Sequence, residues 1–292
     1  LIDEYDKPML QAIGNEALLT DYRNTLKAFY GALKSNDNYL RFALLTGVTK
    51  FSKVSVFSDL NNLMDISIDD RFASICGITE HELHTDFKED ILTLAQKNRM
   101  TENEAKQQLK EQYDGYHFVE DSEDIYNPFS LLNTFAKMKF GSYWFETGTP
   151  TFLLERLRKN PMDETKLDKM TEIAQSDFDI SPELTEDTLP MLYQTGYLTI
   201  KGYNKEDHSY TLGYPNREVR EGFLRGLLAN YKSSEGMSAS FVLKFNKALK
   251  DNDVNGSLEL LQSFMAGIPY DLENKTEKHY QTIIYLVFSL LG

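Results

Sequence analysis

The 292-residue sequence contains a single cysteine, Cys76, so no disulfide can form within the chain. Such low cysteine usage is typical of proteins kept in a reducing compartment, and we expect a cytoplasmic protein. We expect Cys76 itself to be a small buried hydrophobic residue rather than a reactive thiol. Long apolar runs are also missing. The most apolar stretch, Ile283 to Leu291, is much shorter than the roughly 20 residues that cross a membrane, and it predicts a buried core helix.

Positive charge is scarce in this sequence. Lys and Arg number 31 against 45 Asp and Glu, which gives a formal net charge of −14. A broad nucleic-acid surface needs clustered Lys and Arg, so this balance disfavours it, although a local basic patch stays open. Metal-binding patterns are weak as well. His81 and His84 lie three residues apart without the HExxH spacing, and we expect no metal there.

The chain begins on Leu1 and Ile2, followed directly by Asp3 and Glu4. Two apolar residues before two carboxylates indicate the end of a buried strand. In nucleotide hydrolases an acidic residue at such a strand end holds Mg²⁺, and a neighbouring carboxylate polarises the attacking water. A solvated acidic turn at a strand end is the alternative interpretation of this pair.

Short apolar runs further along predict more strands of a parallel sheet. Residues Met9 to Leu40 have helical spacing, and Arg41 to Thr46 is a short apolar run typical of a buried parallel strand. Phe72 to Ile78 is a second such run, and Thr79 begins a helix as its N-cap. This order predicts the second half of a doubly wound α/β domain.

The middle of the sequence is mainly helical. Residues Asp86 to Tyr113 predict two helices broken near Met100, with a new cap at Thr101. Gly115 follows in an aromatic stretch and is expected to adopt a positive φ in a tight turn. We favour a packing role for these aromatic residues over a binding role. Residues Asn160 to Glu186 are polar and acidic, which is typical of a boundary or a surface excursion.

The last third predicts a helix followed by a hairpin. Leu189 to Tyr197 has helical spacing, and strand-like runs cover Tyr197 to Gly202 and Ser209 to Leu212. This combination is typical of a winged-helix unit. Asn216 is a suitable N-cap for an amphipathic helix that reaches Tyr231. The remainder of the chain is helical again.

Five motifs in this order resemble the bacterial AAA-ATPase-like family, a group of P-loop NTPases related to the STAND and archaeal ATPases. Members usually carry a C-terminal PD-(D/E)XK nuclease-like domain. The resemblance covers nearly the whole chain, and the motifs are LIDEYDKP at 1–8, LTGVTKFSK at 45–53, YDGYHF at 113–118, YNPF at 126–129 and QTGYL at 194–198.

The resemblance implies a role for several residues that follow the strands expected at the start of the chain and at 41–46. Asp3 would be the Mg²⁺-associated residue, Glu4 the base that activates water, and Thr46 the polar residue that senses the γ-phosphate. Lys50 would contact phosphate, although a solvated lysine is the alternative. Thr46 could equally be a residue that only caps the strand end.

The resemblance also implies a division of the chain and its cofactors. Residues 1–112 would be a partial P-loop NTPase core from the Walker B strand onward. Residues 113–180 would form a helical lid region, 181–235 the winged-helix-like unit, and 236–292 a helical segment leading into the nuclease-like domain. ATP and Mg²⁺ would act in the intact protein, with nucleic acid as a candidate partner, no membrane, and a homo-oligomer as an open alternative.

The sequence contains no G-x-x-x-x-G-K-[ST] stretch, whose amides and lysine hold the phosphates of a nucleotide. We therefore expect the chain to be truncated before Leu1, inactive as an ATPase by itself and with no cofactor bound. The resemblance implies truncation at the other end as well, because the strands of the nuclease-like domain would follow Gly292. Two other functions remain open. The winged-helix-like unit could bind nucleic acid, or the chain could act as a protein-interaction module.

Overall fold

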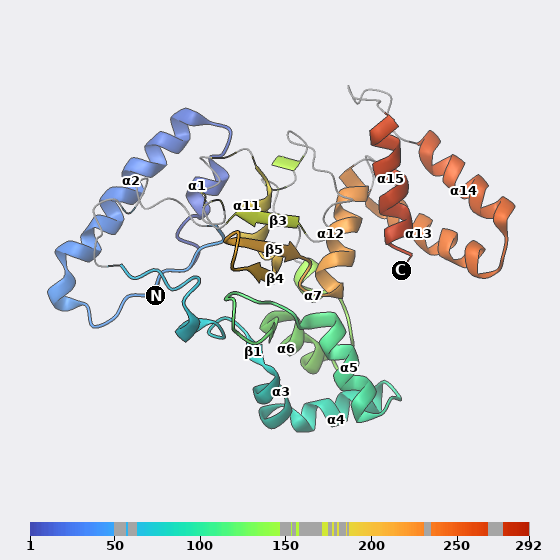
Figure 1. Ribbon diagram of the computed structural model, residues 1–292, viewed down its shortest axis with the longest axis horizontal. Helices are drawn as coiled ribbons and strands as arrows, with labels where there is room; N and C mark the ends of the chain where they lie inside the picture. Colours follow the sequence, from blue (N-terminus) through green and yellow to red (C-terminus); the bar gives the residue numbers. More distant parts are fainter. Residues whose placement is uncertain are drawn as a thin grey trace.

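The computed structural model describes residues 1–49, 57, 63–146, 153, 156–157, 171–174, 177, 180, 185, 187–230, 235–267 and 277–291. Figure 1 shows helices around a small central sheet, with α1 and α2 on one side, α3 to α6 below, and α13 to α15 on the other side. None of the described helices is long and apolar enough to cross a lipid bilayer. Lys50, Lys53 and most of residues 150–158 lie outside the described residues.

The first unit contains the opening segment and a long helix. Helix α1 spans Lys7–Gln11 and α2 spans Glu16–Ser35, with a 3₁₀ turn at Asp37–Tyr39. The predicted helical stretch is broken at Gly14, whose φ is 89°. A helix cannot continue through a left-handed residue, so the chain turns there and Asn15 caps α2. Met9, Leu10, Leu19 and Tyr30 form the buried core of this unit.

The second unit is a helical group between Ile78 and Phe140. Its strand β1 (Ile78–Thr79) pairs antiparallel with β2 (Ile125–Tyr126). One buried cluster joins all its helices, so it contains residues from both sides of the boundary that we predicted at 112. Its helices are α3 (Glu80–Asp86), α4 (Lys88–Lys97), α5 (Glu102–Tyr113) and α6 (Pro128–Lys137).

Local signals placed these helices correctly. Thr79 and Thr101 each cap a helix in a capping box with the glutamate three residues later, as expected. The break near Met100 is confirmed, because α4 ends at Lys97 and α5 begins at Glu102.

The strand expected at Phe72 to Ile78 is wrong for most of its length. The chain forms a 3₁₀ turn at Asp70–Phe72 and further turns up to Gly77. Asp69 begins these turns. Its carboxylate accepts a hydrogen bond from the Arg71 amide and forms an ion pair with the Arg71 guanidinium at 2.6 Å. Only residues 78–79 pair as a strand, and their partner is antiparallel. Similarly, within Arg41 to Thr46 only Leu45 forms a bridge, a parallel one with Ile2.

The third unit is built on a three-stranded antiparallel sheet in the order β3-β5-β4. Strands β4 (Thr199–Asn204) and β5 (Ser209–Gly213) form the predicted hairpin. Strand β3 (Thr171–Ala174) lies in the stretch that we interpreted as a polar boundary, and it pairs with β5. The helices of this unit are α7 (Tyr143–Glu146), α11 (Leu189–Gln194), α12 (Arg217–Asn230), α13 (Glu235–Lys250), α14 (Val254–Ala266) and α15 (Glu277–Ser289).

One large hydrophobic core holds this third unit together. Val219, Phe223 and Leu227 lie four residues apart on α12 and are all buried, which agrees with the amphipathic helix expected here. The apolar run near the end of the sequence forms the predicted core helix α15, with Ile283 and Leu286 fully buried. The same core includes residues of the hairpin and of α13 and α14, so the sheet and the terminal helices are one packed body.

Candidate functional site

The opening segment pairs in parallel with the segment around Leu45. The Ile2 amide donates to the Leu44 carbonyl at 2.9 Å, and the Thr46 amide donates to the Ile2 carbonyl at 2.9 Å. Asp3 and Thr46 therefore follow directly on two paired parallel segments. Two segments that run in parallel end on the same side of their bridge, so the residues that follow them lie close together. The Thr46 hydroxyl donates a hydrogen bond to Oδ1 of Asp3. The two residues that the resemblance assigned to one site are thus in contact.

Asp6 fixes the turn that follows Thr46. Its side chain is fully buried and accepts hydrogen bonds from the amides of Val48 at 2.9 Å and Thr49 at 2.6 Å, and from the Thr49 hydroxyl at 2.9 Å. Gly47 fits because a Cβ there would come within 2.5 Å of the Tyr5 ring. We did not single out Asp6 from the sequence. Its position three residues after Asp3 in the same motif was the only signal.

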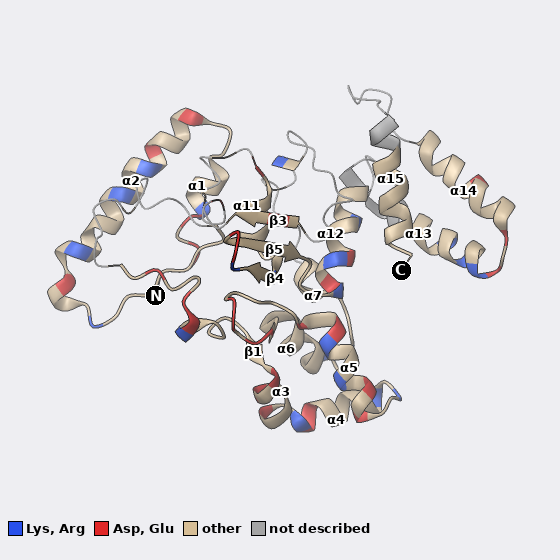
Figure 2. Cartoon of the chain, viewed as in Figure 1, with Lys and Arg blue, Asp and Glu red and all other residues tan. Residues whose placement is uncertain are grey.

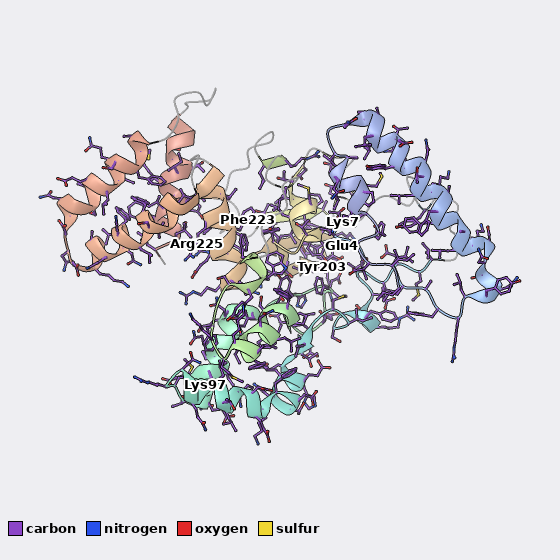
Figure 3. The ribbon with its side chains drawn as sticks, turned by 180° about the vertical axis from the view of Figure 1, so that it is seen from behind. Glu4, Lys7, Lys97, Tyr203, Phe223 and Arg225 are labelled. Carbon is purple, nitrogen blue, oxygen red and sulfur yellow. The ribbon has the colours of Figure 1, made fainter. Side chains whose placement is uncertain are left out.

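Glu4 lies at the surface beside its helix. Its backbone has a φ of 50°, and its carboxylate accepts a hydrogen bond from the Lys7 ammonium at 2.6 Å. Figure 3 shows Glu4 and Lys7 next to each other at the start of α1. The Glu4 carboxylate raises the pKa of Lys7. The carboxylate of Glu4 is exposed and points at this lysine, so activation of water by Glu4 requires that the ion pair be released.

Among the described residues, no group of three His, Cys, Asp or Glu side chains could hold a metal ion. The expectation that Cys76 is buried is wrong, because its side chain is exposed at the end of the turns before β1. Neighbouring atoms partly desolvate the sulfur and raise the pKa of the Cys76 thiol.

A cavity of about 300 Å³ lies where the three units meet. Four of the five motifs contribute to its wall, together with Cys76 and Trp144. The contributions are Gly47 and Val48, Tyr116 and Phe118, residues 126–128, and residues 194–196. We call it the aromatic pocket. Sequence reasoning favoured packing for these aromatic residues and did not predict that they would surround a cavity.

Turns and caps place the walls of the aromatic pocket. Gly115 has a φ of 102°, as predicted, and a Cβ there would come within 2.2 Å of the Pro215 carbonyl. This close approach turns the chain so that Tyr116 faces Gly196, whose carbonyl accepts the Tyr116 hydroxyl at 3.2 Å. Phe118 stacks beside Tyr116 with ring centroids 6.2 Å apart. Burial raises the pKa of the Tyr116 hydroxyl, which therefore stays protonated.

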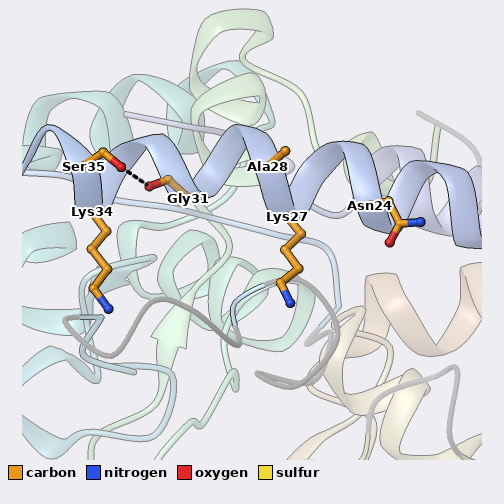
Figure 4. Close-up of a pocket in the computed structure, with 6 residues that line it drawn as sticks. All are labelled: Asn24, Lys27, Ala28, Gly31, Lys34 and Ser35. Atoms are coloured by element: carbon orange, nitrogen blue, oxygen red, sulfur yellow. Dashed lines mark hydrogen bonds between the residues drawn. The ribbon is translucent and has the colours of Figure 1, made fainter.

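A second and more open cavity, of about 500 Å³, runs along one face of α2. Figure 4 shows Lys27 and Lys34 extending from the same side of the helix toward this cavity. All of its described lining residues come from α2 alone. A ligand site normally draws groups from several elements, so this cavity is the weaker candidate.

The comparisons with known proteins bear on the first unit most directly. Residues 1–57 match a family model described as predicted AAA-ATPase. This segment contains Asp3, Glu4 and Thr46. The chain is also 35% identical over 301 residues to an uncharacterised protein encoded in the vnfD 5′ region of Azotobacter chroococcum mcd 1. The alignment covers all of this chain and 55% of that protein, so the chain spans about half the length of its relative. No solved structure matches.

Proposed function

We propose that the edge formed by Asp3, Glu4 and Thr46 is the Mg²⁺ and water side of an ATP site in the intact protein. The contact between Thr46 and Asp3 across a parallel bridge carries this proposal. Parallel strand ends bring the metal-side acid and the phosphate-sensing hydroxyl of a nucleotide hydrolase to one edge. The family match over residues 1–57 supports the same function.

The residues present fit a magnesium ion that is bound mainly through phosphate. Mg²⁺ is usually held by one or two carboxylates and by substrate oxygens, and it keeps several waters. Asp3 supplies an exposed carboxylate and Thr46 a hydroxyl. When bound, the ion would neutralise charge on the transferred phosphate. Asp3 would orient it, Thr46 would position a phosphate oxygen, and Glu4 would accept a proton from the attacking water once Lys7 releases it.

Asp6 and Tyr5 would keep this edge in shape during the reaction. The Tyr5 hydroxyl donates to the Thr49 carbonyl at 3.1 Å, and Asp6 holds the amides of the same turn. We propose that the intact protein is an ATP-dependent switch of the AAA-ATPase-like kind, coupled to a PD-(D/E)XK nuclease-like module. The helical region and the winged-helix-like unit would change their angle to the ATPase core on hydrolysis.

Nucleic-acid binding by the winged-helix-like unit has less support. The turn of the hairpin, residues 205–208, contains one lysine and two acidic residues. Figure 2 shows acidic and basic residues interspersed along α2, α5 and α12. On α12, Arg217 pairs with Glu221 at 2.6 Å. Charges neutralised in this way offer little attraction to a phosphate backbone.

The test is ATP hydrolysis by the longer protein that contains this chain and supplies a phosphate-binding loop. Glu4→Gln should lower kcat by about two orders of magnitude or more, because general base catalysis contributes 10²–10⁴-fold. Asp21→Asn, which removes an exposed carboxylate of the same unit on α2, is the matched control and should leave the rate unchanged. Equal rates for the wild type and Glu4→Gln would eliminate Glu4 as the base.

A further inference from the structure

We propose that the aromatic pocket is a binding site for a planar heteroaromatic ring of nucleobase size. The cavity of about 300 Å³ is at the lower end of the range for small-molecule sites and admits one or two fused rings. This inference is independent of the proposed ATP site, because it depends on other residues and on ring binding rather than on phosphate.

The chemistry of the wall selects a flat ring. Tyr116, Phe118 and Trp144 line the cavity and present aromatic surface, which binds flat rings through stacking and edge contacts. Phe118 and Trp144 are only partly buried, so part of their surface is open to a ligand. An aliphatic ligand would gain nothing from the orientation of these rings.

The polar groups of the wall select a ring with a polar edge. Asn127, Gln194, Thr195 and Cys76 line the same cavity. Several of these groups already bind within the protein: the Thr195 hydroxyl donates to the Met191 carbonyl at 2.7 Å, and the Gln194 amide donates to the Ile180 carbonyl at 3.1 Å. We therefore expect stacking to dominate, with little discrimination between purine bases.

The aromatic pocket lies between the three units, so a bound ligand would connect them. Gly47 and Val48 belong to the turn that follows Thr46 in the first unit. Residues 126–128 belong to the second unit and residues 194–196 to the third. A ring bound here would contact all three units at once. The bound ring would hold the turn at Gly47 and Val48, which Asp6 stabilises, in place against the second and third units. Ring binding would thereby affect the position of Asp3 and Thr46, which lie next to this turn.

The chain contains its own reporters for this site. Trp144 and Cys76 are the only tryptophan and the only cysteine in the sequence, and both line the pocket. Titration of this chain with adenosine should therefore change Trp144 fluorescence saturably, with half-saturation on the order of 1 mM as expected for a single stacked ring. Adenosine should also slow alkylation of Cys76 by N-ethylmaleimide in proportion to occupancy.

Two substitutions provide a matched comparison. Phe118→Leu removes a stacking wall and should weaken adenosine binding several-fold, whereas Phe129→Leu changes an exposed phenylalanine outside the pocket and should bind as the wild type does. Cys76→Phe fills the cavity from an exposed position and should abolish the saturable signal. Melting curves of each variant confirm that it is folded.

Three results would overturn the proposal. The first is the absence of any saturable adenosine response in folded wild-type chain. The second is equal binding by Phe118→Leu and Phe129→Leu, which would place the ligand elsewhere. The third is saturable binding of N-acetyl-phenylalaninamide without binding of adenosine, because this would assign the pocket to an aromatic side chain of a peptide. Guanosine binding similar to that of adenosine would support recognition of the ring faces.

Discussion

Thr46 and Asp3 are 43 positions apart in the sequence, and their side chains share a hydrogen bond at the end of a parallel bridge. The bond links the two segments directly after the bridge between Ile2 and Leu45. It is accessible from solvent, because Asp3 is exposed and Thr46 is partly exposed. An exposed hydrogen bond contributes little to folding, so its conservative removal should act on function more than on stability.

Thr46→Val removes the hydroxyl and keeps the shape of the side chain. Under the proposed function, ATP hydrolysis by a longer protein that supplies a phosphate-binding loop should fall at least about tenfold, which corresponds to loss of one transition-state contact of about 1.4 kcal/mol. Thr46→Ser retains the donor and should keep most of the rate. A Thr46→Val protein with unchanged kcat would show that Thr46 only caps the strand end.

Asp6→Ala should destabilise the first unit strongly. The substitution leaves the half-buried amide of Val48 and the buried amide and hydroxyl of Thr49 without their acceptor, and we expect a loss of about 3 kcal/mol in the free energy of unfolding. Urea denaturation of this chain measures it. Asp37→Ala, at an exposed acidic position in the same unit, is the control and should change stability by less than about 0.5 kcal/mol. A similar small effect for Asp6→Ala would contradict the role of Asp6 in the turn.

Two glycine substitutions should act in opposite directions. Gly115→Ala forces a side chain into a left-handed residue and toward the Pro215 carbonyl, so we expect a loss of more than about 2 kcal/mol. Gly31 lies within α2, and apart from the adjacent backbone of α2 no atom of the described residues lies within 4 Å of a Cβ added there. Gly31→Ala should therefore stabilise the chain by roughly 0.5–1 kcal/mol, since alanine is the better helix former. Thermal and urea unfolding of the two variants tests both signs.

The Asp69 carboxylate should titrate abnormally. Hydrogen bonds from the Arg71 side chain and amide lower the pKa of Asp69 from 3.8 to about 2. A lowered carboxylate pKa in the folded state contributes stability above pH 3.8, and this contribution is lost as the pH falls toward 2. NMR titration of the side-chain carbon of Asp69 measures this pKa. In Arg71→Gln the pKa should rise toward 3.8, and a value that stayed near 2 would contradict the assignment to Arg71.

The sequence predicted elements well where the signal was local. Thr79, Thr101 and Asn216 were assigned as caps, and each accepts a hydrogen bond from an amide three residues later. Gly115 was expected to have a positive φ, and it does. These features depend on residues within about four positions of each other, so a short window of sequence contains the whole interaction.

Other predictions failed because the deciding contact was distant or because a local polar signal was overlooked. The apolar run ending at Ile78 looked like a parallel strand, but the pair of Asp69 and Arg71 begins turns that continue to Gly77, and only residues 78–79 pair, antiparallel, with β2. Strand β3 was missed because its acidic surroundings resembled a surface loop, and only pairing with β5 makes it a strand.

The amino-acid order alone determined the helix caps, the turn glycines, the amphipathic face of α12 and the order of the five motifs. Only the folded chain decided which of those motifs meet: Asp3 with Thr46 at one edge, and Tyr116, Trp144 and Gly196 around one cavity. The physical reason is that the hydrophobic effect is non-directional, so burial of an apolar side chain stabilises its contact with any apolar partner of suitable shape. Which distant segments come together therefore depends on how the whole chain packs.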